Sequence, residues 1–375
     1  MSGDVLTQRA LNRALLSRQL LLSRVPAAAD RPGQVLETVE HLAGLQAQAP
    51  FPPYYGLWSR LDGFRPADLA GLLTTRQVVR IALMRGTIHL VSARDCLLLR
   101  PLVQPALDHV LGVLFGGRLD AAELARLAAA GRALAGRQPC TFSELGTHLA
   151  QRWPGHPPNS LAQAVRVLVP LVQVPPRAVW GAAGQARHVP AEAWLGEPLA
   201  ARPDAEILVR RYLTAFGPAT IADLQRWSGR ARLGETVRRL RPELALFRDE
   251  QGRELFDLPE APRPGPDMPA PARLVAEFDN LLLGHADRTR VISDPHRRRL
   301  GTVNAVIPGA VLVDGFVIGS WRITAAGETA TLTIRPFESV PRAAFAALEA
   351  EGQRLLEFAR PAAAPRDVLF EPVTG

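Results

Sequence analysis

Two glutamines one residue apart, Gln46 and Gln48, have side-chain types and a spacing that could take part in a reaction. They lie in the stretch HLAGLQAQAPFPPYYGLW (residues 41–58), where a helical pattern stops abruptly before several prolines. An amide side chain donates and accepts hydrogen bonds but does not ionise, so it cannot act as a general acid or base. If this pair is catalytic, its substrate must already be primed to react.

The charge balance of the chain favours a polyanionic partner such as DNA. The 375 residues include 44 basic and 36 acidic ones, a formal net charge of +8, and the isoelectric point of the sequence is near 10.8. All the basic residues are arginines, which a high-GC coding bias would also produce. Without lysine the chain can hold neither a P-loop G-K-[ST] motif nor a lysine Schiff base.

The two cysteines, Cys96 and Cys140, lie outside any spacing typical of zinc ligands or of a disulfide framework. We therefore expect two buried, reduced thiols, and neither a metal nor a cofactor. Near the N-terminus, Arg9, Arg13 and Arg18 interrupt the leucines, so no unbroken apolar run occurs there. This pattern argues against a signal peptide or a membrane span and predicts a cytoplasmic protein.

The order helix, turn, helix, hairpin recurs along the chain and predicts winged-helix modules. In the copy at 141–191, Thr141 or Ser143 can cap the first helix, and Asn159 or Ser160 can cap the second. Extended runs that could pair as a hairpin lie around residues 172–174, 179–180 and 188–189.

A second copy lies at 216–260, where Thr220 caps the first helix and Ser228-Gly229 makes the turn. Its second helix bears Arg232, Arg238 and Arg239, and a two-stranded wing follows around Gln251-Gly252. A looser copy places a hairpin within 65–92, turning at Arg85-Gly86, after helices at about 5–22 and 33–45.

A proline-rich linker at 259–273 precedes a region of different character. Strands are expected there, the first at 303–307, followed by a terminal helix at about 342–358, while the basic run at 294–301 is expected to be a loop. We therefore expect a helix-rich α+β fold with three winged-helix modules and a C-terminal α+β region. The expected boundaries are 1–125, 126–200, 201–262 and 263–375.

Four segments in order resemble the winged-helix DNA glycosylase family of the azinomycin-resistance type, the AlkZ-like family. They are Gln46-Ala47-Gln48, MRGTIHLVSARD (84–95), FGPATIADLQRWSG (216–229) and FDNLLLGHADRTRVI (278–292). The resemblance runs over nearly the whole chain. It implies three tandem winged helices on a concave scaffold, and excision of bulky or crosslinking N7-alkylated purines. The self-resistance branch of this family carries Gln-apolar-Gln, whereas its sister repair branch has aspartate at the position of Gln48.

The resemblance gives the glutamine pair a chemical role. Alkylation at N7 puts a positive charge on guanine, so the base leaves as a neutral heterocycle with little need for a general acid. We therefore assign Gln46 and Gln48 to positioning water against C1′ and to stabilising the oxocarbenium-like sugar. Since the chain lacks lysine, water is the expected nucleophile and an intact strand with an abasic site the expected product.

The resemblance also implies an open basic cleft on double-stranded DNA that carries N7-alkylpurine lesions, bound by a monomer near the nucleoid. The residues expected to line this cleft are Arg85, His89, His285, Arg288, Arg297, Arg298 and Arg299. Two alternatives remain open: a winged-helix transcriptional regulator, and a drug-sequestering protein that uses the aromatic residues of PFPPYYGLW (50–58).

Overall fold

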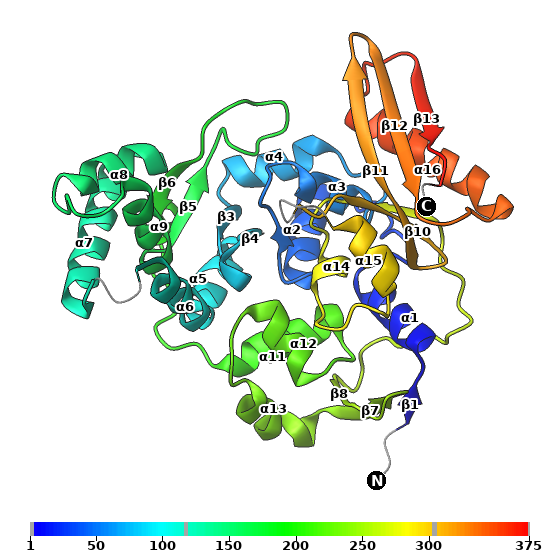
Figure 1. Cartoon of the computed structure of the whole chain (residues 1–375), viewed down its shortest axis with the longest axis horizontal. Helices are drawn as coiled ribbons and strands as arrows, with labels where there is room; N and C mark the ends of the chain where they lie inside the picture. The colour runs from blue at the N-terminus through cyan, green and yellow to red at the C-terminus, as the bar shows by residue number, and fades with distance from the viewer. Residues whose placement is uncertain (1–3, 116–118, 302–305, 374–375) are drawn as a thin grey trace.

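The computed structural model describes residues 4–115, 119–301 and 306–373, which form a mixed α+β fold rich in helix (Figure 1). The helices are α1 (Gln8–Arg18), α2 (Arg31–His41), α3 (Pro52–Trp58), α4 (Pro66–Thr74), α5 (Ala93–Leu102), α6 (Gln104–Phe115), α7 (Ala121–Arg137), α8 (Phe142–Ala150), α9 (Pro158–Leu168), α10 (Ala191–Leu195), α11 (Ala205–Phe216), α12 (Ile221–Ser228), α13 (Gly234–Leu240), α14 (Asn280–Leu283), α15 (Asp294–Leu300) and α16 (Arg342–Ala359), with short 3-10 turns η1 (Met84–Gly86) and η2 (Arg241–Glu243).

The strands of the described residues fall into three sheets. They are β1 (Val5–Leu6), β2 (Leu45–Gln46), β3 (Val78–Ala82), β4 (Ile88–Ser92), β5 (Leu171–Val174), β6 (Arg187–Pro190), β7 (Ala245–Asp249), β8 (Glu254–Asp257), β9 (Arg273–Val275), β10 (Gly309–Val313), β11 (Phe316–Ala326), β12 (Thr329–Pro336) and β13 (Arg366–Phe370).

The sheet that carries the glutamines joins two parts of the chain that are distant in sequence. Its strand order is β2-β4-β3-β5-β6, and β3 pairs with β5 through Arg80 opposite Gln173. The first and second expected hairpins therefore share one sheet. The edge strand β2 pairs antiparallel with β4, which sets Gln46 opposite His89. The predicted turn at Arg85-Gly86 is confirmed, since η1 connects β3 to β4.

Most of the third unit follows the prediction, but α13 begins at Gly234, so it bears Arg238 and Arg239 and not Arg232. Thr220 caps α12 in a capping box with Asp223, and Gly229 ends that helix in the left-handed region at φ 75°. Strands β7 and β8 pair antiparallel on either side of Gly252. The sequence did not predict that the N-terminal strand β1 would extend this wing, pairing parallel with β7.

Several local predictions differ from the structure. The basic run at 294–301 forms helix α15 because Ser293 caps it and Pro295 occupies its first turn. Residues 179–180 lie in turns, because Trp180 packs against Tyr54 instead of pairing in the sheet. Helix α9 begins at Pro158, ahead of the expected caps. The strand expected at 303–307 lies partly outside the described residues, and the part that is described is not a strand.

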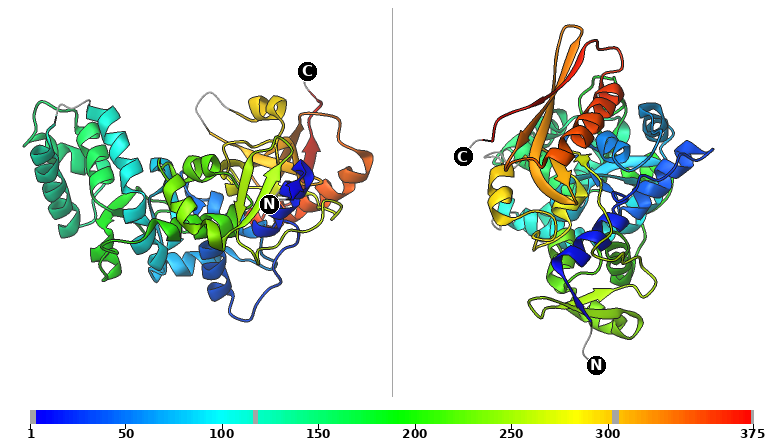
Figure 2. Two further views of the ribbon diagram at one scale, coloured as in Figure 1. Left: turned by 90° about the horizontal axis from the view of Figure 1, so that it is seen from below. Right: turned by 90° about the vertical axis from the view of Figure 1, so that its right-hand side faces the viewer.

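The last region carries a sheet of order β13-β12-β11-β10-β9, against which α16 packs. The predicted terminal helix is confirmed, and the β11–β12 hairpin projects from the body of the molecule (Figures 1 and 2). The arm formed by α7, α8 and α9 lies at the opposite end (Figure 2). Cys96 and Cys140 are buried and free, as expected. Among the described residues, no helix is long and apolar enough to cross a membrane.

Candidate active site and nucleic-acid interface

The backbone of residues 44–48, which carries both glutamines and which we call the glutamine strand, is held by hydrogen bonds at several points. The Ala47 N–H donates to the Ile88 carbonyl at 2.7 Å, and Arg80 Nη2 donates to the Ala47 carbonyl at 2.6 Å. Just upstream, Asn280 Nδ2 donates to the Gly44 carbonyl at 2.7 Å. These bonds come from β4, β3 and α14, so three elements fix the course of the glutamine strand, in which β2 itself is only two residues long.

Arg80 is an unusual support because it is buried and has no carboxylate partner among the described residues. Burial, and next the nearby charge of Arg177, lowers the pKa of Arg80 to about 10. The guanidinium is therefore still charged at neutral pH, and its Nε and Nη1 lack hydrogen-bond partners in the described structure. A buried charge of this kind is costly, which makes the carbonyls of the glutamine strand its main compensation.

The two glutamine side chains are anchored by their oxygens. Gln46 Oε1 accepts a hydrogen bond from Arg85 Nη2 at 2.8 Å, and Gln48 Oε1 accepts one from the Ile88 N–H at 3.2 Å. Both partners can only donate, so the oxygen and not the nitrogen of each amide must face them. Each Nε2 is left without a protein partner in the described part of the chain, while each oxygen keeps a second lone pair.

The structure places His89 beside the pair but in the interior. It is 2% exposed, and its Nδ1 lies 3.1 Å from the Thr87 carbonyl oxygen. Burial, followed by the charge of Arg85, lowers the pKa of His89 to about 3, so the ring is neutral at physiological pH. His89 therefore lies opposite Gln46 in the interior of the sheet, where its side chain does not reach a phosphate.

His285 lies away from the surface that was expected to include it. Its Nε2 donates to the Phe216 carbonyl at 3.0 Å, and its ring packs near Tyr212 and Phe216. Burial lowers the pKa of His285 well below its usual value. The sequence suggested a DNA contact at this position, and the structure covers the ring with α11.

Four arginines lie within electrostatic range of one another in a series that begins at Arg85, the partner of Gln46, and we call them the arginine cluster. Its members are Arg85, Arg226, Arg288 and Arg297. Burial, then the charges of Arg226 and Arg288, lowers the pKa of Arg85 to about 10. Burial also lowers the pKa of Arg288, followed by the charges of Arg226 and Arg297. The cluster thus draws on η1, α12, the segment after α14, and α15.

The charge of this cluster is poorly compensated within the protein. In the described residues, neither Arg226 nor Arg288 has a carboxylate partner, and Arg297 pairs with Asp294 only within its own helix, at 3.0 Å. Like charges that lack counter-ions repel one another, and a bound polyanion relieves that repulsion. Arg226 was not among the residues predicted from the sequence, although it lies in a segment that carried the family resemblance.

The three consecutive arginines of α15 differ in their surroundings. Arg297 and Arg288 lie at a pocket of about 300 Å³ whose remaining lining is mostly apolar, including Ile292. Arg298 is exposed, whereas Arg299 donates to the Phe337 carbonyl and lies over the Phe337 ring. Arg297 and Arg298 are thus the members of this run with guanidinium groups that can face a partner.

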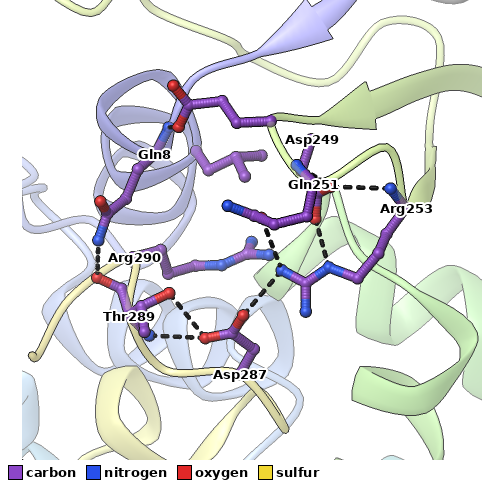
Figure 3. Close-up of a pocket in the computed structure, with 9 residues that line it drawn as sticks. Gln8, Asp249, Gln251, Arg253, Asp287, Thr289 and Arg290 are labelled. Carbon is purple, nitrogen blue, oxygen red and sulfur yellow. Dashed lines mark hydrogen bonds and ion pairs between the residues drawn. The ribbon is translucent and has the colours of Figure 1, made fainter. Parts of the chain in front are cut away.

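A second pocket, of about 350 Å³, lies between α1, the β7–β8 wing and the segment 287–290 (Figure 3). Asp287 accepts from Arg253 at 2.7 Å and from the Thr289 hydroxyl at 2.7 Å. The pocket lining includes neither glutamine of the pair and carries the carboxylates of Asp249, Glu250 and Asp287, which disfavour a phosphate. This pocket lies between the wing and the segment 287–290, and it is not the candidate active site.

The aromatic residues of PFPPYYGLW are packed and do not form an open surface. Tyr54 is fully buried, its hydroxyl donates to the Ala178 carbonyl at 2.7 Å, and its ring centroid lies 5.0 Å from that of Trp180. The sequence had suggested aromatic surface for a ligand here. The structure assigns these rings to the core instead. In the described residues no group of three or more His, Cys, Asp or Glu side chains could hold a metal ion.

Comparison with known proteins defines the family of this chain. A sequence model described as "DNA glycosylase AlkZ-like" matches residues 39–358. The chain belongs to the AlkZ-like DNA glycosylase family.

A curated protein and a solved structure, both from Streptomyces sahachiroi, are similar to this chain. An interstrand DNA cross-link repair glycosylase is 31% identical over 155 residues, which cover 39% of this chain and 40% of that protein. The alignment thus spans less than half of that relative. The solved structure of the DNA glycosylase AlkZ superposes with a TM-score of 0.81 over 97% of this chain and 100% of that chain, at 20% identity. This second likeness shows a shared fold.

Proposed function

We propose that this protein is a DNA glycosylase that hydrolyses the N-glycosidic bond of bulky or crosslinking N7-alkylated purines. Its biological role in this proposal is unhooking of interstrand crosslinks and self-resistance to a genotoxic natural product. The observation that carries the proposal is the anchored amide pair, Gln46 and Gln48, next to the arginine cluster in a chain of this family. The Streptomyces sahachiroi relative is an interstrand DNA cross-link repair glycosylase, which supports the substrate class.

The chemistry suits side chains that do not ionise. The bond between C1′ and N9 breaks with both electrons passing to the cationic purine, which leaves neutral. The water oxygen then bonds to C1′ of the oxocarbenium-like sugar, and its proton passes to solvent. Catalysis here requires positioning and electrostatic complementarity more than proton transfer to the base.

Gln46 and Gln48 are the catalytic residues in this proposal. Each amide oxygen is held by a donor on the protein, so each amide presents its Nε2, which can donate to an acceptor on the substrate or to the oxygen of the attacking water. The nearby His89 is neutral and buried, so it takes no part in proton transfer. An uncharged base would leave slowly with such mild help, and this gives selectivity for cationic purines.

DNA binding in this proposal uses three winged-helix modules, with boundaries at 1–125, 126–200 and 201–262, on a concave scaffold completed by residues 263–375. The protein acts as a monomer on DNA in the cytoplasm. Phosphate contacts come from Arg226, Arg288 and Arg297 of the arginine cluster and from Arg298. A transcriptional regulator and a drug-sequestering protein are less well supported, since the family is one of glycosylases and Tyr54 is buried.

The phosphate contacts predict a measurable salt dependence. Replacing Arg297 and Arg298 together by glutamine should flatten the plot of log affinity against log salt by about 0.9 for each phosphate that is no longer neutralised. The expected change for two phosphates is a slope about 1.8 units shallower. Fluorescence anisotropy with one labelled duplex at several salt concentrations measures it.

The matched control removes two exposed arginines from the ends of α16. Arg342 and Arg360 are exposed and carry the same total charge as Arg297 and Arg298. Their double replacement by glutamine should leave the slope close to that of the wild type. Equal slopes for the α15 variant and the wild type would remove α15 from the interface.

The absence of lysine from the sequence predicts the reaction product. Glycosylases that also cut the strand commonly form a Schiff base between an amine and C1′, and lysine is suited to that role. After incubation with a 7-methylguanine duplex, strand breaks should therefore arise only on treatment with hot alkali. Borohydride added during the reaction should trap no covalent adduct between protein and DNA.

A lysine-dependent bifunctional glycosylase, run in parallel, should give the trapped adduct and so verify the assay. An adduct with the present protein would instead identify its α-amino group as the nucleophile. Strand cleavage without alkali by purified protein would also contradict hydrolysis by water.

A further inference from the structure

We propose that Arg85 is a positioning residue that fixes the Gln46 amide with its oxygen turned inward and its Nε2 presented to the substrate. The inference rests on the proposed function, and it replaces the phosphate contact that the sequence suggested for Arg85. The key observation is that its guanidinium is divided between two acceptors. Nη2 donates to Gln46 Oε1 at 2.8 Å, and Nη1 donates to the Trp227 carbonyl at 2.6 Å.

The Trp227 carbonyl gives the guanidinium a fixed anchor. It belongs to the last turn of α12, where carbonyls lack partners within the helix and where the helix dipole favours a cation. A planar guanidinium can bridge two acceptors in a set geometry, which an ammonium cannot do. Arg85 therefore ties the orientation of one catalytic amide to the end of α12.

The backbone of Arg85 is also constrained. Arg85 has φ 56° and ψ 15°, in the left-handed region that non-glycine residues seldom occupy. A Cβ on Gly229, the C-cap of α12, would come within 3.1 Å of the Arg85 Cα and N. Gly229 itself has φ 75°, a conformation that favours glycine. The turn η1 and the end of α12 therefore pack against each other at a contact that requires glycine at position 229. Such local strain is common where a side chain is held for function.

Gln48 shows the same arrangement with a different donor. The Ile88 N–H bonds its Oε1, so the β-sheet backbone does for Gln48 what the Arg85 side chain does for Gln46. Both amides thus present Nε2 groups. This geometry changes the role first assigned to Gln46, from an oxygen that faces the sugar cation to a donor that faces an acceptor on the substrate or the attacking water.

The test is a double-mutant cycle between Arg85 and Gln46 on a 7-methylguanine duplex. Arg85→Met should lower the single-turnover excision rate at saturating protein by roughly 10- to 100-fold, the range for losing a charge-assisted hydrogen bond. Duplex affinity and its salt slope should stay close to wild type. Adding Arg85→Met to Gln46→Ala should cause little further loss, since the two residues act through one bond.

Arg85→Lys provides a second variant that keeps the charge. A lysine ammonium keeps the charge but lacks the rigid planar fork of a guanidinium, so the rate should fall to a value between those of wild type and Arg85→Met, with an unchanged salt slope. A lysine variant with the wild-type rate would overturn the inference. Arg342→Met, at the exposed start of α16, is the control for loss of one positive charge.

The alternative outcomes separate this inference from the proposed function. A wild-type rate in Arg85→Met, with a salt slope shallower by about 0.9, would make Arg85 a phosphate contact. Independent, multiplying losses in the double variant would show that Arg85 acts apart from Gln46. In either case a slow Gln46→Ala variant would leave the proposed function standing, whereas a wild-type rate in Gln46→Ala would remove Gln46 from the catalytic pair and overturn the role of Arg85 with it.

Discussion

Replacing Gln46 or Gln48 by alanine should slow excision of an N7-alkylated purine by about 10²-fold or more, the scale of losing one preorganised electrostatic group at a reacting centre. Both amides are held by donors on the protein, so their positions are set during folding and not during the reaction. Duplex affinity should barely change, because neither side chain is charged. Single-turnover rates and anisotropy titrations on the same duplex measure the two quantities.

Gln77→Ala is the matched control for these variants. Gln77 is exposed just before β3, and its Nε2 donates to the Thr75 hydroxyl at 3.0 Å, away from the glutamine strand. Its excision rate should equal that of the wild type. Wild-type rates in both Gln46→Ala and Gln48→Ala would place the active site elsewhere.

The second large effect concerns stability. Asp279→Ala should reduce the free energy of unfolding by about 3–5 kcal/mol, the typical result of leaving one buried charge unpaired. Arg60 and Asp279 are fully buried and form two hydrogen bonds, of 2.9 and 2.8 Å. This pair attaches the start of α14 to the segment after α3, and the next residue, Asn280, holds the Gly44 carbonyl. Urea unfolding at neutral pH measures the loss.

Two further variants give this prediction its contrast. Asp279→Asn keeps an acceptor for Arg60 and should lose less stability than the alanine variant. Glu254→Ala breaks the exposed pair between Glu254 and Arg241, where water screens the charges, and its unfolding midpoint should move far less. Equal unfolding curves for Asp279→Ala and the wild type would contradict a structural role for the buried pair.

Local features of the fold were predictable because their signals lie within a few residues. The Thr220 cap, the Gly229 helix end and the turn at Arg85-Gly86 each depend on side-chain types close to the turn that they form. One exception is α15, where the basic composition suggested a loop, although Ser293 supplied a capping signal that was present in the sequence.

Long-range contacts could not be predicted from the sequence in the same way. The pairing of Arg80 with Gln173 joins two hairpins across a large separation in sequence, and no periodic pattern encodes such a partner. His285 sits in a polar segment typical of a surface, yet residues of α11 far upstream bury it. The role of Arg80 had a partial signal, since a charged residue interrupts the apolar strand VVRIA (78–82).

The most direct test of the central claim is the release of free base from a duplex that carries a single 7-methylguanine, measured by mass spectrometry. The wild-type protein should release 7-methylguanine in equal amount to the abasic sites formed, and should release no guanine from an undamaged duplex. The variant with both Gln46 and Gln48 replaced by alanine should bind the same duplex and release almost none. Binding without release of base by the wild type, or equal release by the double variant, would contradict a glycosylase that works through this amide pair.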